Sequence, residues 1–319
     1  MTSDRCISRR MFLASSASGI VAAGLTPFAA RGDSKGGSGM PTPFRYSLNM
    51  GTVMGHKLSL EQEIEIAAKA GYDAVEPWIR KIEEYRNGGG SLKDLGKRIR
   101  DLGLTVEGAI GFTRWIVDDD AARAQGLEQY KREMAMLAEM GGKRIAAPPA
   151  GATGDPKLDL TKAAERYRAL LGIGDEVGVT PALEIWGSSK NLGRLSEAAF
   201  VAIESGHPKA CIIPDVFHMY KGGSGFHGVK LVSNRMIPVF HLNDYPADPP
   251  RERISDRDRV FPGDGIAPLS QILRDLYDNG AGTVLSLELF NPAYWREDAL
   301  TVAKTGLEKM KTSVEKALS

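Results

Sequence analysis

The stretch Ile237-Pro238-Val239-Phe240-His241-Leu242-Asn243-Asp244 (IPVFHLND) decides the fold of this 319-residue sequence. It is an apolar run that contains one histidine and ends on two polar residues. Such a run is typical of a strand in a parallel sheet that is covered on both faces. Seven further runs of this character predict strands at 44–50, 74–78, 104–110, 143–149, 180–186, 210–215 and 283–290.

Amphipathic segments separate these strands and predict helices, among them 60–71, 92–103, 163–178 and 266–280. These four segments end in glycines of the kind that close helices: Gly71, Gly103, Gly178 and Gly280. Eight alternating strand–helix units predict an α/β fold, a single-domain (β/α)8 TIM barrel over residues 44–319. A doubly wound open sheet is the alternative. It is disfavoured because no Gly-x-Gly-x-x-Gly motif follows a predicted strand.

The first 43 residues have a different composition from the rest and predict no part of the fold. Arg9 and Arg10 precede Phe12-Leu13 and a weakly apolar run that ends near Ala30. This pattern predicts a cleavable twin-arginine signal peptide over 1–30, followed by a flexible linker over 31–43. The apolar run is too short and too rich in small residues for a stable membrane span. We therefore expect export to the periplasm or another extracytoplasmic space, with no membrane insertion of the mature chain.

Charge and cysteine content exclude several functional classes. The formal net charge is +1, with 41 basic and 40 acidic residues, so the sequence predicts no nucleic-acid partner. The two cysteines are Cys6, which would leave with the signal peptide, and Cys211. One remaining thiol can form neither an internal disulfide nor a cysteine metal cage. Cys211 lies in the apolar run ACII, which predicts a small core residue.

Polar side chains at the predicted carboxyl ends of the strands indicate a functional site. In a TIM barrel, these ends face the catalytic mouth. A carboxylate inside an apolar strand is costly unless it is paired, hydrogen-bonded or bound to a metal. Six such residues are expected to converge there: Glu76, Glu107, Glu184, Asp215, His241 and Glu288.

Four of these residues lie on the last four strands and suit one divalent metal ion. Three carboxylates and one imidazole, from Glu184, Asp215, Glu288 and His241, fit Mn²⁺, Mg²⁺, Co²⁺ or Zn²⁺ without choosing among them. His218 follows Asp215 by three residues and is expected just above the strand end, where a substrate hydroxyl could meet it.

The last third of the chain carries a family resemblance. Residues 241–295, HLNDYPADPPRERISDRDRVFPGDGIAPLSQILRDLYDNGAGTVLSLELFNPAYW, contain a His-x-x-Asp strand end, an Asp-Arg-Val-x-Pro-Gly-x-Gly loop and a Glu-Leu-Phe-x-Pro strand. Together with VTPALEIWG at 179–187 and DVFHMY at 215–220, they resemble the xylose isomerase-like TIM barrels. This is the sugar isomerase/epimerase superfamily, and the chain is most similar to 2-keto-myo-inositol isomerases.

The resemblance implies roles for particular residues. It places the metal ligands on Glu184, Asp215, His241 and Glu288, the four chosen from the strand ends. It also implies that His218 and Arg259 contact substrate oxygens, with Arg257 as the competing choice. Trp186 and Glu76 complete the expected substrate contacts. Trp78 and Trp115 are further aromatic residues that could line the mouth, although each is also a plausible packing residue.

The activity implied is metal-assisted proton transfer next to a carbonyl, through an enediolate, with Glu184 and Glu288 removing and returning the proton. This predicts an isomerase or epimerase of a keto-sugar or keto-inositol. The alternative is a metal-dependent lyase or dehydratase acting on oxidised sugars or 3-keto-glycosides. A non-catalytic sugar-binding protein is less favoured. The expected partner is a small carbohydrate or inositol, and a homo-oligomer is left open.

Overall fold

The computed structural model describes residues 44–280 and 282–319. The predicted signal peptide and linker, residues 1–43, lie outside this part of the chain. The described residues contain eight strands, and each begins and ends inside one of the stretches predicted from the sequence. They are β1 Arg45–Asn49, β2 Ala74–Glu76, β3 Thr105–Val106, β4 Arg144–Ala147, β5 Thr180–Glu184, β6 Ile212–Ile213, β7 Val239–Leu242 and β8 Val284–Leu287.

The strands form two parallel ladders that together close a barrel. One ladder has the order β3-β2-β1-β8-β7 and the other has the order β4-β5-β6. On one side they are joined through Ala109, whose N–H donates to the carbonyl of Arg144 at 3.1 Å and whose carbonyl accepts from Ala146 at 2.9 Å. On the other side, the N–H of His241 donates to the carbonyl of Pro214 at 2.9 Å. The predicted TIM barrel is confirmed.

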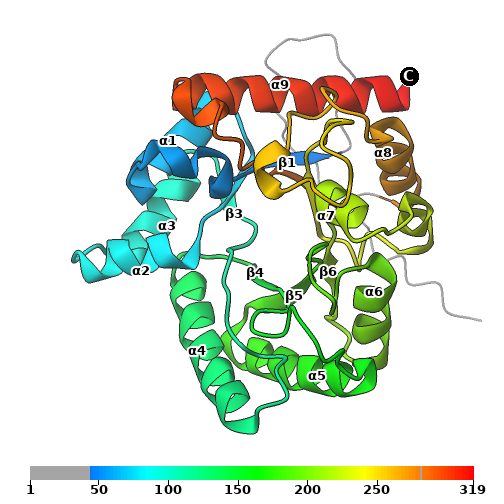
Figure 1. Ribbon diagram of the computed structural model, residues 1–319. Helices are drawn as coiled ribbons and strands as arrows, with labels where there is room; N and C mark the ends of the chain where they lie inside the picture. The colour runs from blue at the N-terminus through cyan, green and yellow to red at the C-terminus, as the bar shows by residue number, and fades with distance from the viewer. Residues whose placement is uncertain (1–43, 281) are drawn as a thin grey trace, which may run out of the picture. The chain divides into compact units, whose positions relative to one another are not determined.

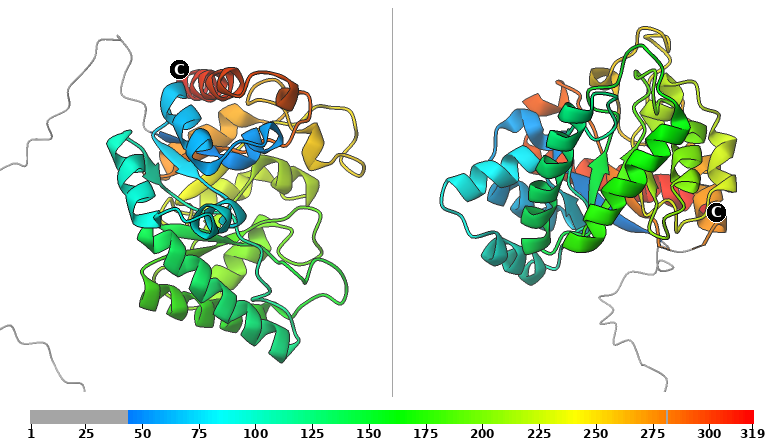
Figure 2. Two further views of the ribbon diagram at one scale, coloured as in Figure 1. Left: turned by 90° about the vertical axis from the view of Figure 1, so that its left-hand side faces the viewer. Right: turned by 90° about the horizontal axis from the view of Figure 1, so that it is seen from below.

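Helices surround the strands (Figure 1) and cover the outside of the barrel in the two further views as well (Figure 2). Their bounds are α1 Leu60–Ala70, α2 Ile79–Asn87, α3 Leu92–Asp101, α4 Asp120–Glu139, α5 Leu160–Val177, α6 Leu195–Glu204, α7 Val216–Lys221, α8 Leu269–Asp278 and α9 Ala299–Leu318. Short 3-10 turns are η1 Met50–His56, η2 Phe226–Leu231, η3 Asp256–Asp258 and η4 Tyr294–Arg296. Within the described part of the chain, no helix combines the length and apolarity that a bilayer crossing requires.

The helix ends follow the local signals in the sequence. Gly71 and Gly178 cap α1 and α5 in the left-handed conformation, with φ of 93° and 84°. There a glycine lacks the steric cost that other residues meet. Helices α3 and α8 end two residues before the predicted glycines, and Gly103 and Gly280 then reverse the chain with φ of 79° and 110°.

The barrel core is apolar and contains the thiol of Cys211. Cys211 is buried, as predicted, in a cluster drawn from six neighbouring strands or their ends. Its other buried members are Ile110, Ala146, Ala182, Ile213, Val239 and Val284. Burial raises the pKa of the Cys211 thiol to about 11, so it stays protonated near neutral pH.

Glu107 does not point toward the catalytic end, contrary to the expectation. Its carboxylate lies among cations at the starting ends of β1 and β4, where Arg45 contacts it at 2.5 Å, Lys143 at 2.7 Å and Arg144 at 3.2 Å. Burial opposes ionisation, but these cations hold the pKa of Glu107 below its ordinary value. Glu107 therefore fastens the opposite end of the barrel.

Candidate active site

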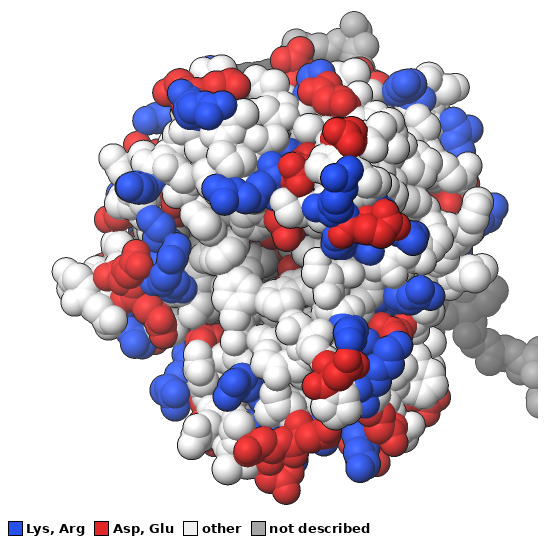
Figure 3. Space-filling view, viewed as in Figure 1, with Lys and Arg blue, Asp and Glu red and all other residues white. Residues whose placement is uncertain are grey.

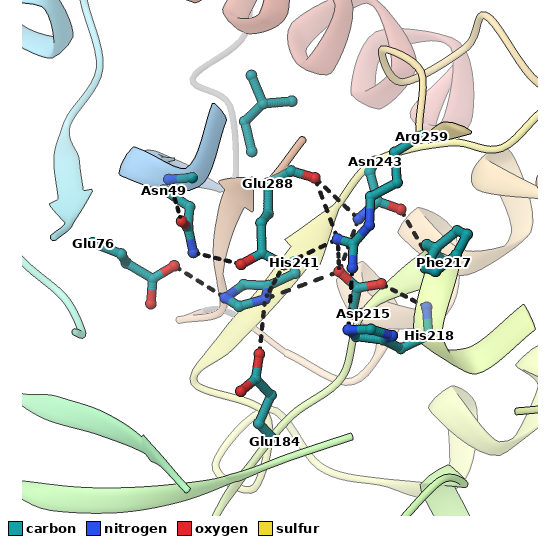
Figure 4. A network of polar contacts seen from close by, with 12 residues as sticks. Asn49, Glu76, Glu184, Asp215, Phe217, His218, His241, Asn243, Arg259 and Glu288 are labelled. Carbon is teal, nitrogen blue, oxygen red and sulfur yellow. Dashed lines mark hydrogen bonds and ion pairs between the residues drawn. The ribbon is translucent and has the colours of Figure 1, made fainter. Parts of the chain in front are cut away.

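The predicted strand-end residues from the last four strands do meet (Figure 4). Glu184 is the last residue of β5, and Asp215 caps α7 directly after β6. His241 lies in β7, and Glu288 follows β8. One ligand atom from each of Glu184, His241 and Glu288 lies within 4.8 Å of the others, and all three residues are buried.

His241 orients its ring between this cluster and a second carboxylate. Its Nδ1 lies 3.2 Å from Oε2 of Glu288, 3.9 Å from Oδ2 of Asp215 and 4.0 Å from Oε1 of Glu184. Its Nε2 lies 3.1 Å from Oε2 of Glu76. The histidine is fully buried, so its ring is held in one orientation with Nδ1 directed into the cluster.

Glu76 therefore has a different place from the substrate contact that was expected. Its side chain is fully buried on the far side of the imidazole from the cluster. Gly108 makes room for it, since a Cβ at that position would lie 2.5 Å from Oε1 of Glu76. The structure assigns Glu76 to the positioning of His241, an arrangement common around metal-binding histidines.

The two glutamates of the cluster have opposite ionisation behaviour. Burial and the nearby charge of Glu288 raise the pKa of Glu184 to about 8. Burial also disfavours ionisation of Glu288, but His241 and Arg259 hold its pKa well below the ordinary value. For His241, burial disfavours the charged ring, yet Glu288 and Glu76 raise its pKa well above the ordinary value. Two carboxylates with separated pKa values are the usual basis for acid and base roles in one site.

Arg259 fills the space beside the cluster and is fully buried. Its Nη1 donates to Oδ2 of Asp215 at 2.8 Å and to Oε2 of Glu288 at 2.9 Å. Its Nη2 donates to Oδ1 of Asp256 at 2.5 Å. Burial opposes the charge, but these three carboxylates raise the pKa of Arg259, so it remains a cation.

The structure consequently differs from the expected contact between Arg259 and substrate oxygens. The guanidinium of Arg259 has no exposed surface, whereas Arg257, the competing choice, is exposed and lines the open pocket. Residues two apart on the loop after β7 thus have different environments. Arg259 neutralises the carboxylates from within, and Arg257 is the one accessible to a ligand.

His218 lies on the pocket wall, in agreement with its expected place. Its Nε2 is 3.1 Å from Nη2 of Arg259, so Nε2 must accept and the proton resides on Nδ1. Burial and the charge of Arg259 lower the pKa of His218, which favours this neutral ring. Its Nδ1 is buried and has no hydrogen-bond partner among residues 44–280 and 282–319.

A pocket of about 570 Å³ opens above the cluster. Figure 3 shows the hollow near the centre of this face, with acidic side chains inside it, uncharged residues along its lower edge and charged side chains along its upper edge. Trp78 and Trp186 line it, as expected, but Trp115 does not. Trp115 is fully buried, and its Nε1 donates to the carbonyl of Pro148 at 2.8 Å. Further aromatic lining residues that the sequence reading missed are Phe112, Phe290 and Trp295.

Two asparagines that sequence reasoning also missed hold the carboxylates. Asn49, at the end of β1, donates from Nδ2 to Oε1 of Glu288 at 2.9 Å and accepts from Nε1 of Trp78 at 3.2 Å. Asn243 donates to Oδ2 of Asp215 at 2.8 Å. Both residues stand at the ends of predicted strands. That position was the available signal.

Asp244 shapes the loop that carries Arg257 and Arg259. Its two carboxylate oxygens accept backbone N–H groups at 2.8 to 3.1 Å. The donors are Tyr245, Gly263, Gly265 and Ala267. This clamp fastens both ends of the loop 245–267 to the end of β7.

The chemistry of the donor set fits a divalent cation. Oε2 of Glu184 is buried and has no hydrogen-bond partner within the described residues, and Nδ1 of His241 lies 3.2 Å from Oε2 of Glu288 without hydrogen-bond geometry. Buried polar atoms without partners are costly unless a ligand satisfies them. Asp215 differs, because Oδ1 accepts from the N–H of His218 and Oδ2 from Asn243 and Arg259. Three of the four predicted ligands therefore form the cluster, and Asp215 lies beside it with its oxygens already engaged.

Comparison with known proteins places this site among related ones. Residues 64–313 match the family described as xylose isomerase-like TIM barrel. The chain is 28% identical over 262 residues to the inosose isomerase of Bacillus velezensis, covering 81% of this chain and 93% of that protein. It is 26% identical to the 3-dehydroshikimate dehydratase of Pseudomonas aeruginosa, covering 79% of this chain and 39% of that protein. The solved structure of the IolI protein with a bound zinc atom superposes with a TM-score of 0.78 at 23% identity, covering 86% of this chain and 99% of that one.

Proposed function

Because the chain belongs to the xylose isomerase-like TIM barrel family, we propose that it is a metal-dependent isomerase or epimerase of a keto-sugar or keto-inositol. One observation supports this most directly. Glu184 and Glu288 reach the floor of the same pocket from β5 and β8, with His241 between them. The similarity to an inosose isomerase over most of both chains supports the same reaction class.

A divalent ion would be held by Glu184, His241 and Glu288, with Asp215 adjoining. When bound, such an ion supplies Lewis-acid stabilisation of negative charge on a carbonyl oxygen. The chain fixes the geometry of this donor set through hydrogen bonds behind it. Glu76 orients the imidazole of His241, and Asn49 holds one oxygen of Glu288.

The reaction itself requires one group that removes a proton next to the carbonyl and one that returns it. We assign these roles to Glu184 and Glu288, whose carboxylates stand on different strands. His218 lines the same pocket and would hydrogen-bond a substrate oxygen. Return of the proton to the neighbouring carbon gives isomerisation, and return to the opposite face of the same carbon gives epimerisation.

Reaction in D₂O tests the proposal. Metal-reconstituted protein is incubated with a keto-inositol or ketose, and the products are followed by NMR. Deuterium in an isomeric product is expected, with loss of turnover in Glu184→Gln and Glu288→Gln. Glu133→Gln is the matched control, because Glu133 is equally buried but lies on α4 away from the cluster. Full activity in both cluster variants would contradict the mechanism.

A metal-dependent lyase or dehydratase acting on a keto-sugar or 3-keto-glycoside is the second candidate. The similarity to a 3-dehydroshikimate dehydratase favours it, and so does the position of His218 on the pocket wall. After proton removal next to the carbonyl, the bond to a β-oxygen would break. His218 would supply the proton to the departing oxygen, which leaves an unsaturated ketone and water or an alcohol. An unsaturated product in the NMR assay would select this alternative.

We further propose that the protein is exported by the twin-arginine route, on the sequence Arg9-Arg10 followed by Phe12-Leu13. Cell fractionation of the full chain tests this. A double Arg9→Lys, Arg10→Lys variant should remain inside the cytoplasm. Export of that variant equal to that of the native chain would refute the proposal.

A further inference from the structure

Four aromatic side chains form a continuous wall along one side of the pocket. The rings follow one another in the order Phe290, Trp78, Phe112 and Trp186, with centroid separations of 6.1, 5.2 and 5.8 Å. All four line the pocket. They follow the ends of β8, β2, β3 and β5, so four separate strands contribute one ring each to this aromatic wall. A wall assembled from four strands is a feature of the barrel end rather than of one loop.

The aromatic wall is near the cluster at both ends and is exposed to solvent at Phe112. At one end, Phe290 follows Glu288 by two residues and lies 5.1 Å from the guanidinium carbon of Arg259. Toward the solvent, Phe112 is 45% exposed, and it is the one exposed large apolar residue of the described chain that lines the pocket. Trp78, between them, is held by its hydrogen bond to Asn49. The wall is therefore preorganised and still accessible to an apolar group.

The distribution of polar groups separates two zones in the pocket. Glu184, Glu288 and His218 stand at the inner end, where a carbonyl and its neighbouring hydroxyls would react. The other polar lining residues are Thr153, Ser188, Ser189, Asp256 and Arg257, and the hydroxyl of Ser189 already donates to the carbonyl of Asn191 at 2.6 Å. The volume of about 570 Å³ also lies within the range of roughly 300–1,000 Å³ that holds drug-sized molecules, which leaves space beyond one sugar ring.

We propose that the aromatic wall binds a planar, apolar substituent attached to the reacting keto ring. The substrate class is then a keto-sugar or keto-cyclitol joined through an oxygen to an aryl group. This inference rests on the function proposed above and specifies its substrate. The keto ring lies against the carboxylates, and the aryl group stacks on Phe112 and Trp186, where offset or edge-to-face contact with aromatic rings is favourable.

Binding measurements without turnover test this subsite. Isothermal titration compares 4-nitrophenyl β-D-glucopyranoside with methyl β-D-glucopyranoside and cellobiose on the mature chain and on its Glu288→Gln variant. The aryl glucoside should bind about tenfold more tightly than the methyl glucoside, as stacking of one ring supports. Phe112→Ala should remove this preference and leave the methyl glucoside affinity unchanged, whereas Trp186→Ala should remove the preference and also weaken binding of the methyl glucoside, because Trp186 contacts Glu184. Phe200→Ala is the matched control, because Phe200 is 40% exposed on α6 and does not line the pocket.

Four results would overturn the inference. They are equal affinity for the aryl and methyl glucosides, no saturable binding of the aryl glucoside, tighter binding of cellobiose, and an aryl preference that survives both wall substitutions. Failure of the proposed function would be seen in the D₂O experiment, as the absence of deuterium from the products of every keto-substrate. If the aryl glucoside is preferred but no deuterium enters the products, the proposed reaction is wrong and the aryl subsite stands. If deuterium enters the products but the aryl glucoside is not preferred, only the subsite is wrong.

Discussion

Replacement of Arg259 by methionine should destabilise the protein strongly, and added metal should restore part of the loss. The guanidinium is fully buried and bonds Asp215, Glu288 and Asp256. Methionine retains much of the volume but leaves buried carboxylates without their cation. Removal of one partner from a buried ion pair typically costs about 3–5 kcal/mol. For a domain of this size, each kcal/mol corresponds to a shift in Tm of about 2–4 °C.

Urea denaturation and thermal unfolding in the presence of a chelator measure this loss. Arg257→Met is the matched control, since it makes the same chemical change two residues earlier on an exposed side chain. It should alter the free energy of unfolding by less than about 0.5 kcal/mol. A divalent cation should raise the Tm of Arg259→Met more than that of the native chain, because the metal ion then replaces the positive charge that Arg259 supplied beside Glu288. Equal destabilisation by the two substitutions would refute the electrostatic role assigned to Arg259.

Three further results are expected. Glu76→Gln should lower metal affinity about 10- to 100-fold, measured by chelator competition, because it weakens the contact that orients His241; unchanged affinity would remove that positioning role. Asn49→Ala should lower kcat about tenfold or more with little change in KM. The reason is that a hydrogen bond to the charged carboxylate of Glu288 is worth about 1.5–3 kcal/mol. A change in KM alone would instead assign Asn49 to substrate binding. Burial raises the pKa of Glu133 to about 7 from an ordinary 4.5, so the folded chain keeps this proton while the unfolded chain loses it. Stability should fall as pH rises from 4.5 to 7 and then level off, and Glu133→Gln should remove this component from urea titrations at several pH values.

Much of the fold could be predicted because its signals are local. Strands buried on both faces appear as apolar runs, and glycines such as Gly71 and Gly178 close helices where the chain needs a positive φ. The metal cluster could be predicted for a related reason. A charged residue within an apolar strand is costly, so Glu184, His241 and Glu288 stand out in the sequence without any knowledge of their partners.

The remaining features depend on partners far away in the chain. The side chain of Glu107 points to the barrel end that holds Arg45 and Arg144, and only the pairing of the strands decides this. Asn49 and Phe112 were missed because a neutral polar or aromatic residue near a strand end carries no evident energetic penalty. Arg257 and Arg259 could not be assigned to their places, because the turn η3, which contains Arg257 and ends just before Arg259, sets which side chain enters the interior.

The candidate site forms only when the two ladders of the barrel stay joined, because each ladder supplies part of it. Glu184 and Asp215 belong to the β4-β5-β6 ladder, while His241 and Glu288 belong to the ladder that ends in β7. The junction between β6 and β7 runs directly between these two pairs and rests on few backbone hydrogen bonds, such as that from His241 to Pro214. A transient opening between β6 and β7 would move Glu184 away from His241, and the three candidate ligands would then no longer lie close enough to bind one ion. A cation bound by residues of both ladders would link them across this junction. It would therefore slow amide hydrogen exchange at His241.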